Sequence, residues 1–266
     1  MIHLTDQEFQ ELVTFIRQKF GINLGKKRLL IEARLFSVLA EKNISSFTEY
    51  FNLLRSNPEE LNTMINRLTT NHTFFMREPR HFEFLKDVIL PEITENRPDK
   101  CLRIWSAGCS TGEEAYTAVM VMKDWFGLCS DWDYRILATD ISTRVLEAAQ
   151  MGIYSAESLQ NLPTGWERKY FRKKEDQGYE LSDEIKKEVI FRSLNLMERF
   201  PFHRPFDLIF CRNVMIYFDQ DTKNKLVQKF YHSLKSGGYL LIGHSETIQR
   251  EIVPFRYIEP SIYQKG

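Results

Sequence analysis

Apolar residues in the first seventy positions recur at the spacing of one helix face, and most of these runs follow residues typical of a helix start. The start signals are Thr5 with Glu8, Ser46 with Glu49, and Asn57 with Pro58. Leucines between positions 29 and 39 fill a further helix. The pattern therefore predicts an all-α helical bundle over residues 1–70.

A different pattern begins after residue 98, where short apolar runs alternate with helical stretches. The predicted strands lie in CLRIWSAG, YRILATD, FDLIFCRN and GGYLLIG, and the helical stretches follow Gly112, Ser142 and Asp221. This alternation favours an α/β domain with a mainly parallel sheet over residues 99–266.

Two segments, residues 71–98 and 157–193, do not follow either pattern. Residues 71–98 are expected to form a connection with one helix, which begins near Pro79 and ends before Pro91 because proline interrupts a helix. Residues 157–193 are highly charged and contain GYELSD and EVIFRSL, which read as two short strands around a polar loop. We expect this segment to be a small antiparallel β insertion at the edge of the sheet.

Composition narrows the class of protein. The 36 Lys and Arg residues balance 36 Asp and Glu residues, so no net field draws the chain to nucleic acid or to an anionic membrane. No apolar run is long enough to cross a bilayer. Cysteines 101, 109, 129 and 211 lack zinc-ligand spacing, and the six histidines are scattered, so we expect reduced thiols, no metal site and a cytoplasmic protein.

Charge is nevertheless uneven within the helical bundle. Residues 17–35 contain six basic residues against Glu32 alone: Arg17, Lys19, Lys26, Lys27, Arg28 and Arg34. Such a cluster is either a solvated basic face or a docking surface for an acidic partner.

The run RIWSAGCSTGEEAYTAVM, residues 103–120, predicts a strand, a glycine turn and a helix, the place where open α/β sheets hold ligands. It lacks both G-x-G-x-x-G and a P-loop lysine. Glu113 and Glu114 would repel a pyrophosphate at this helix start, so a ligand that is positive at this end is expected. S-adenosylmethionine fits, with its ammonium and sulfonium groups. Alternatively, both glutamates only stabilise the helix.

Three further stretches follow predicted strands. Asp140 stands where a carboxylate accepts hydrogen bonds from ribose hydroxyls, or else caps the next helix. Asn195 and Leu196 stand where an adenine ring could be bordered, although Asn is also a common turn residue. Arg212, Asn213 and Tyr217 lie at or beyond the strand end in FDLIFCRNVMIYFD, and Tyr217 is either a wall of the pocket or a core aromatic residue.

Taken in order, LTTNHTFFMREPRHF, IWSAGCSTGEEAYT, ATDIS, SLNLM and FDLIFCRNVMIYFD resemble the CheR-type chemotaxis receptor glutamate methyltransferases over nearly the whole chain. The resemblance implies a Rossmann-like S-adenosylmethionine methyltransferase sheet after an all-α domain. It also implies methyl transfer to glutamate side chains of chemoreceptor cytoplasmic domains, with glutamyl methyl esters and S-adenosylhomocysteine as products.

The resemblance also implies roles for individual residues. Asn71, Thr73 and Arg77 would reach the cofactor, Glu114 would hold its ammonium, and Asp140 its ribose. The adenosine side would be held by Asn195, Leu196, Arg212 and Asn213, and the receptor by Lys26, Lys27, Arg28 and Arg34. Certain family members bind a receptor tail peptide through the β insertion.

A glutamate side chain is already ionised at neutral pH, so methyl transfer to it needs no general base. We therefore expect Arg77 to position cofactor or substrate, with Tyr217 walling the pocket, while Phe74, Phe75 and Phe82 pack between the domains. The enzyme is expected to be a monomer that does not bind nucleic acid. Alternatives are a methyltransferase of another carboxylate or of nucleic acid, and a non-enzymatic cofactor-sensing signalling scaffold.

Overall fold

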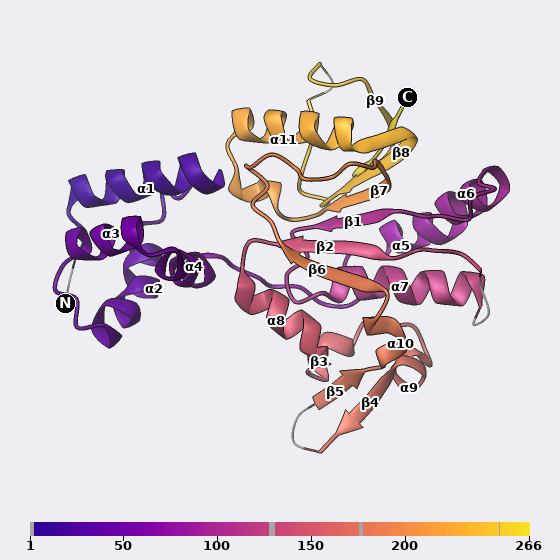
Figure 1. Cartoon of the computed structure of the whole chain (residues 1–266), viewed down its shortest axis with the longest axis horizontal. Helices are drawn as coiled ribbons and strands as arrows, with labels where there is room; N and C mark the ends of the chain where they lie inside the picture. Colours follow the sequence, from indigo (N-terminus) through magenta and orange to yellow (C-terminus); the bar gives the residue numbers. More distant parts are fainter. Residues whose placement is uncertain (1–2, 128–130, 176–177, 250) are drawn as a thin grey trace.

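The chain folds into a helical part and an α/β part, which lie side by side in Figure 1. The computed structural model describes residues 3–127, 131–175, 178–249 and 251–266. The helical part consists of α1 (Asp6–Phe20), α2 (Arg28–Glu41), α3 (Phe47–Ser56) and α4 (Pro58–Leu68). The predicted all-α bundle is confirmed.

Each predicted start signal of the bundle caps a helix. Thr5 accepts a hydrogen bond from the backbone N–H of Glu8, whose carboxylate accepts one from the backbone N–H of Thr5. Ser46 caps α3 by accepting from the backbone N–H of Glu49, whose carboxylate accepts from the backbone N–H of Ser45. Asn57 caps α4. These bonds satisfy amides that have no partner within the helix.

The α/β part is built on a seven-stranded sheet with the order β6-β2-β1-β7-β8-β10-β9. Its strands are β1 (Ile104–Ala107), β2 (Ile136–Asp140), β6 (Val189–Ser193), β7 (Phe206–Cys211), β8 (Leu234–Ile242), β9 (Phe255–Glu259) and β10 (Ile262–Lys265). The five strands from β6 to β8 pair in parallel, and β10 and β9 add antiparallel pairs. The predicted mainly parallel sheet is confirmed.

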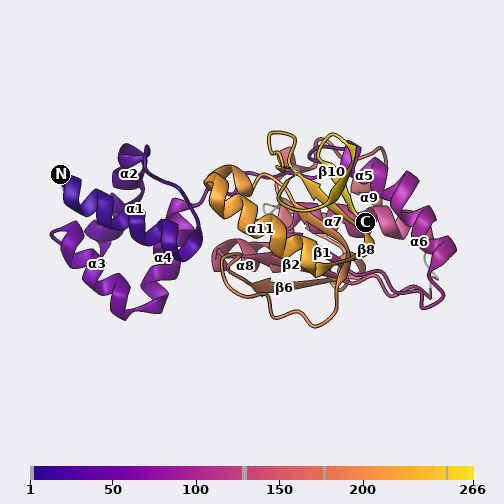
Figure 2. The same ribbon diagram turned by 90° about the horizontal axis from the view of Figure 1, so that it is seen from above.

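Helices cover both faces of this sheet. The main ones are α7 (Glu113–Phe126), α8 (Thr143–Met151) and α11 (Gln220–Ser233). Neighbouring residues of β1 serve different cores, because Ile104 packs in the cluster that contains α7 and Trp105 in the one that contains α11. Both views place α11 beside the helical part (Figures 1 and 2).

The connecting helix is longer than the sequence predicts. It runs as α5 (Arg80–Phe84), a π-helical turn (Leu85–Ile89) and α6 (Leu90–Asn96), so the predicted end before Pro91 is wrong. In an α-helix the ring of Pro91 would collide with the carbonyl four residues earlier. The wider turn, in which the N–H of Leu90 donates to the carbonyl of Leu85, directly precedes the proline.

The insertion is also arranged differently. A separate sheet has the order β3-β5-β4, with β3 (Ile153–Tyr154), β4 (Phe171–Lys174) and β5 (Gly178–Leu181), and its pairs are antiparallel. The predicted second strand, EVIFRSL, is β6, which pairs in parallel with β2 in the main sheet. The expected pairing of GYELSD with EVIFRSL is therefore wrong, because α10 (Asp183–Lys186) separates the two strands.

Three short helices complete the described elements: η2 (Glu157–Leu159), α9 (Trp166–Tyr170) and η3 (Met215–Tyr217). Cys101, Cys109 and Cys211 are free thiols, as predicted, and Cys129 lies outside the described residues. Among the described helices, none has both the length and the apolar character that crossing a membrane requires.

Candidate active site

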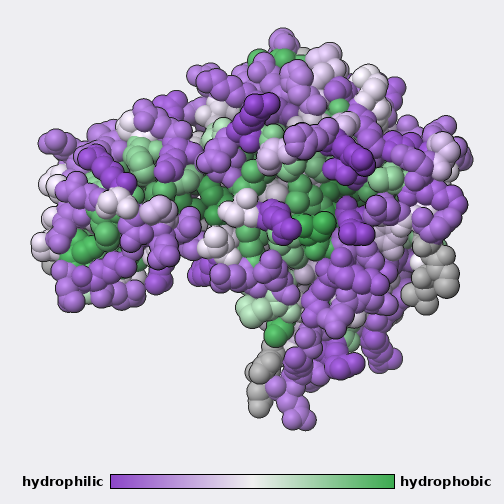
Figure 3. Space-filling model, viewed as in Figure 1, coloured by the Kyte–Doolittle hydropathy of each residue, from purple (hydrophilic) through white to green (hydrophobic). Residues whose placement is uncertain are grey.

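A cavity lies where the helical part meets the carboxyl ends of the parallel strands. The empty space of this cavity, together with the open solvent at its mouth, is about 1210 Å³. Figure 3 shows apolar side chains gathered between the two parts on the face viewed. The cavity is lined by ten residues that the sequence singles out: Asn71, Thr73, Arg77, Glu114, Asp140, Asn195, Leu196, Arg212, Asn213 and Tyr217. The fold thus brings together side chains from five separate segments.

The two glutamates at the start of α7 face different surroundings. Glu114 lines the cavity and accepts hydrogen bonds from Ser106 Oγ at 2.6 Å and from Arg212 Nη1 at 3.1 Å. Burial raises the pKa of the Glu114 carboxyl, and Arg212 and Ser106 act in the opposite direction. Glu113 is buried outside the cavity lining and accepts from Thr111 Oγ1 at 2.7 Å. A ligand role thus suits Glu114, and a local structural role suits Glu113.

The turn before α7 depends on glycine. Gly108 has φ of +87°, and a Cβ at this position would lie 2.3 Å from Val214 Cγ2. The turn thereby lets the loop after β7 approach the loop after β1, so that Glu114 and Arg212 meet.

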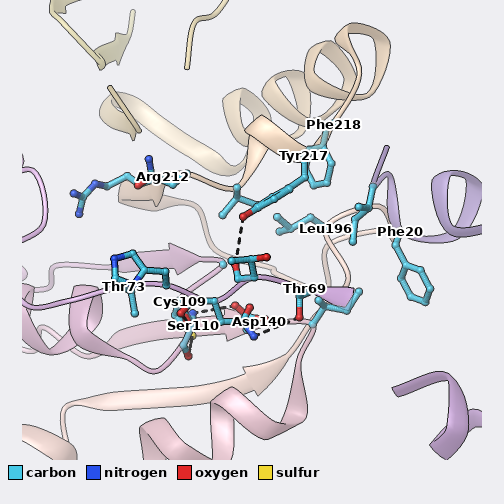
Figure 4. Close-up of a pocket in the computed structure, with 18 of the residues that line it drawn as sticks. Phe20, Thr69, Thr73, Cys109, Ser110, Asp140, Leu196, Arg212, Tyr217 and Phe218 are labelled. Carbon is cyan, nitrogen blue, oxygen red and sulfur yellow. Dashed lines mark hydrogen bonds between the residues drawn. The ribbon is translucent and has the colours of Figure 1, made fainter. Parts of the chain in front are cut away.

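Asp140 ends β2 at the floor of the cavity, close to Cys109 and Ser110 (Figure 4). Its carboxylate accepts hydrogen bonds from the backbone N–H groups of Ser110 and Ser142, both at 2.9 Å. Burial raises the pKa of the Asp140 carboxyl despite these two bonds. Ser142 itself caps α8, so Asp140 is not the residue that caps this helix.

Arg212 stands between two carboxylates. Its Nε lies 3.2 Å from Glu78 Oε2, Nη1 contacts Glu114, and Nη2 donates to the carbonyl of Arg77. The side chain is 2% exposed. Figure 4 shows Arg212 across the cavity from Leu196. Arg212 thus lies at the same end of the cavity as Glu114.

The other end of the cavity is apolar and is closed by the helical part. Leu196 packs in one cluster with Phe218 and Ile22, and Phe20 lines the cavity beside them. Asn195 Nδ2 donates to the carbonyl of Lys19 at 2.8 Å. The residues predicted to border an adenine ring therefore form part of the contact between the two parts.

Arg77 lies on the connecting segment and lines the cavity. Its Nη1 donates to the carbonyl of His72 at 2.9 Å, and its guanidinium lies 6.0 Å from the ring centroid of Phe74. Asn71 lies in the same connecting segment, and its carbonyl accepts a hydrogen bond from Ser110 Oγ at 2.9 Å. This bond ties the segment to the glycine turn.

The predicted packing between the domains is wrong for Phe75 and Phe82. Phe75 makes edge contacts with Tyr154 and Phe171, and Phe82 stacks on Phe210. Both therefore belong to the core of the α/β part. Phe82 also lines the cavity from that side, and Phe74 lines it where the two parts meet.

Tyr217 is half-buried and also lines the cavity, so it is not a residue of the closed core. Its hydroxyl donates to the carbonyl of Thr70 at 3.3 Å, and Lys27 Nζ lies 5.6 Å from its ring centroid. The backbone N–H of Asn23 donates to the Tyr217 carbonyl at 2.8 Å. The helical part thus contacts the loop that carries this tyrosine.

The basic residues of α2 and the turn before it have different surroundings. Lys26 and Lys27 are exposed, and Arg28 pairs with Asp6 at 2.6 Å. Arg34 donates to the carbonyls of Leu68 and Thr69 and to Thr70 Oγ1. These contacts hold α2 against the end of α4, and the role of Arg34 in receptor docking stays a prediction.

Sequence reasoning missed two carboxylates, Glu78 and Glu246. Burial opposes ionisation of Glu78, but Arg212 and the backbone N–H of His244 outweigh it and hold the pKa of Glu78 below its usual value. Glu246 is buried and accepts from backbone N–H groups only. A charged residue in a loop directly after an apolar strand was the signal available for Glu246.

Glu78 also lies near two histidines. The ligand atoms of Glu78, His81 and His244 lie within 4.8 Å of one another. His81 is fully buried, and its ring nitrogens have no hydrogen-bond partner among the described residues, although Nδ1 lies 3.5 Å from Glu78 Oε2. Burial and Arg212 lower the pKa of His81 to about 3. Arg212 already pairs with Glu78, so a metal cation at this position would face a fixed guanidinium. We assign no metal to this cluster.

Comparison with known proteins also separates the helical part from the α/β part. Residues 7–69 match the family described as CheR methyltransferase, all-alpha domain, and residues 71–263 match CheR methyltransferase, SAM binding domain. The chain is 47% identical to the chemotaxis protein methyltransferase of Borreliella burgdorferi over 100% of its own length and 96% of that protein. It is 39% identical to the chemotaxis protein methyltransferase of Escherichia coli, over 91% of this chain and 85% of that one.

Proposed function

The chain belongs to the CheR methyltransferase family and is an S-adenosylmethionine-dependent methyltransferase, and from this premise we propose that it methylates glutamate side chains of chemoreceptor cytoplasmic domains. The products are glutamyl methyl esters and S-adenosylhomocysteine, and the reaction serves sensory adaptation in bacterial chemotaxis. The single observation that supports this acceptor most strongly is the full-length similarity to chemotaxis protein methyltransferases.

The residues of the cavity fit S-adenosylmethionine. Glu114 offers a carboxylate to the ammonium group, and Asp140 offers one to the ribose hydroxyls. The apolar end around Leu196 and Phe218 suits an adenine ring. We propose that Arg212 and Asn213 act at the methionine end, because they contact Glu78 and Glu114.

The cofactor supplies a methyl group on a positively charged sulfur, and the protein has to align a carboxylate oxygen with it. Arg77 is suited to orient that carboxylate, because a guanidinium can donate two parallel hydrogen bonds. Its partial exposure keeps the pairing from becoming so strong that it stabilises the ground state. Tyr217 walls the cavity and helps to exclude water, which favours a reaction in which opposite charges neutralise.

We propose that the receptor docks on the basic residues before and at the start of α2, namely the exposed Lys26 and Lys27 and the half-buried Arg28. Leu29 follows them and is 80% exposed, so the surface combines positive charge with an apolar side chain. An acidic receptor helix would be attracted by this charge. Lys27 lies over the ring of Tyr217, which brings the docking surface next to the mouth of the cavity.

The test is methyl transfer from tritiated S-adenosylmethionine to receptor-containing membranes, followed by mild base. We expect label on the receptor that base releases as volatile methanol, as an ester requires. Label that resists base would exclude a carboxylate acceptor, and cofactor binding by calorimetry without any transfer would favour the signalling scaffold. Treatment with a chelator should leave the rate unchanged, since no step calls for a metal.

A further inference from the structure

Glu246 lies in the turn after β8 and is 5% exposed. Its Oε2 accepts hydrogen bonds from the backbone N–H of Gly243 at 2.6 Å and of Asn213 at 3.0 Å, and its Oε1 accepts one from Ile216 at 3.1 Å. Among the described ion pairs, none involves this carboxylate. Backbone amides of two loops thus surround one buried carboxyl group; burial raises its pKa, and the hydrogen bonds from these amides act in the opposite direction.

The loop that donates two of these bonds runs from the end of β7 to the start of α11. It carries Arg212, Asn213 and Tyr217, all of which line the cavity. Asn213 has φ of +59°, in the left-handed region that asparagine adopts more readily than most other non-glycine residues. The backbone N–H groups of Asn213 and Ile216 donate to the Glu246 side chain, which ties this loop to the turn after β8.

The fit around the carboxylate is tight. A Cβ at Gly243 would lie 2.7 Å from Asn213 Nδ2 and 2.9 Å from Glu246 Oε2. The loop after β7 and the turn after β8 can approach this closely only because position 243 has no side chain.

We infer that Glu246 is a positioning residue for methyl transfer: its carboxylate fixes the loop from Arg212 to Tyr217 in the conformation that lines the cavity. It contacts neither cofactor nor acceptor itself. The inference rests on the methyltransferase activity of the family and holds whichever acceptor is used.

The charge of Glu246 matters as well as its shape. A carboxylate is an acceptor at every lone pair, whereas a glutamine side chain has one acceptor atom and an NH₂ group. In Glu246→Gln this NH₂ would face at least one of the backbone N–H groups, so donor would oppose donor and the loop would shift. Misplacement of catalytic groups by about 1 Å can cost about a hundredfold in rate.

The first experiment measures S-adenosylhomocysteine binding by calorimetry and the rate of methyl transfer in Glu246→Gln. The control is Val253→Ala, which truncates a buried side chain of the segment after β8 that does not line the cavity. Each variant is assayed at the same interval below its own thermal midpoint, so that differences in stability do not enter. We expect S-adenosylhomocysteine binding about ten- to a hundredfold weaker, and slower methyl transfer, in Glu246→Gln only. Wild-type binding and rate in Glu246→Gln, or an equal loss in the control, would overturn the inference.

The second experiment is chemical rescue. Glu246→Ala leaves space among the backbone N–H groups that acetate matches in charge and size. We expect acetate to restore binding and transfer in a saturable way, while sodium chloride at the same ionic strength does not. A response to acetate no larger than the response to chloride would also overturn the inference. S-adenosylhomocysteine binding is measured without any acceptor. If the wild-type protein did not methylate receptors, the proposed acceptor would be wrong, but the binding data would still test the inference on Glu246.

Discussion

Glu114 pairs with Arg212, which also pairs with Glu78. The negative charge of Glu114 should therefore have a measurable effect on cofactor binding. We predict that Glu114→Gln weakens S-adenosylhomocysteine binding about ten- to a hundredfold, because a hydrogen bond to a charged group is worth about 1.5–3 kcal/mol. Isothermal titration calorimetry measures this. Glu113→Gln, one residue away and outside the cavity lining, should keep wild-type affinity. Equal losses in both variants would contradict the separate roles.

Arg77 offers a second prediction at this scale. Arg77→Ala should slow methyl transfer at least about tenfold and leave the thermal midpoint nearly unchanged, because its side chain is partly exposed and makes one described hydrogen bond. A single-turnover assay with the labelled cofactor measures the rate. Arg80→Ala removes an exposed arginine three residues along that pairs with Glu259, and should transfer normally. Cofactor binding and transfer at wild-type levels in Arg77→Ala would contradict the role.

The sequence identified the residues that line the cavity but not those that hold them. Glu114 and Asp140 stand beside glycine turns and strand ends, where local pattern has a physical meaning. Glu78 meets Arg212 across 134 positions, and Glu246 meets Asn213 across 33. No local pattern encodes such contacts, because they depend on which strand ends become neighbours in the sheet.

At the scale of elements, the sequence predicted the helices and strands of the fold better than their limits. Capping residues are local, so the helix starts at Asp6, Phe47 and Pro58 followed directly from the sequence. The continuation of the connecting helix through Pro91 did not, because it depends on a π-helical turn. The place of β6 in the main sheet could not be predicted either, because the sequence of a short strand does not specify which sheet it joins.

The end of α1 provides a prediction for one element. Gly21 has φ of +73°, and a Cβ there would lie 2.6 Å from Met197 Sδ and 3.0 Å from Thr222 Cγ2. Gly21→Ala should therefore lower the free energy of unfolding by more than the roughly 1–2 kcal/mol that a left-handed conformation costs. Gly237→Ala, with φ of +76° and open space around it, isolates that conformational cost. Equal destabilisation of the two variants in urea would show that crowding at Gly21 is relieved.

At the scale of the whole molecule, the last turn of α1 and the connection that follows it contact the α/β part. Ile22 forms a bridge with Phe218, and Arg17 pairs with Asp219 at 2.6 Å. These contacts join positions about two hundred apart in the chain, so sequence pattern could not predict them. They place the basic turn at the mouth of the cavity, where a docked acidic helix would come within reach of Tyr217.

This arrangement predicts a change in receptor recognition without a change in chemistry. Lys26 is exposed and lies outside the cavity lining, so Lys26→Glu should raise KM for receptor membranes about several-fold while leaving kcat and the affinity for S-adenosylhomocysteine unchanged. The difference from wild type should shrink as salt is raised, because exposed charges are screened.

Lys86→Glu reverses an exposed charge on the π-helical turn, at the end of the α/β part away from the helical part (Figure 1), and should keep the wild-type KM. An equal rise in KM for both variants would mean that net charge draws the receptor, and an unchanged KM for Lys26→Glu would remove this lysine from the docking surface.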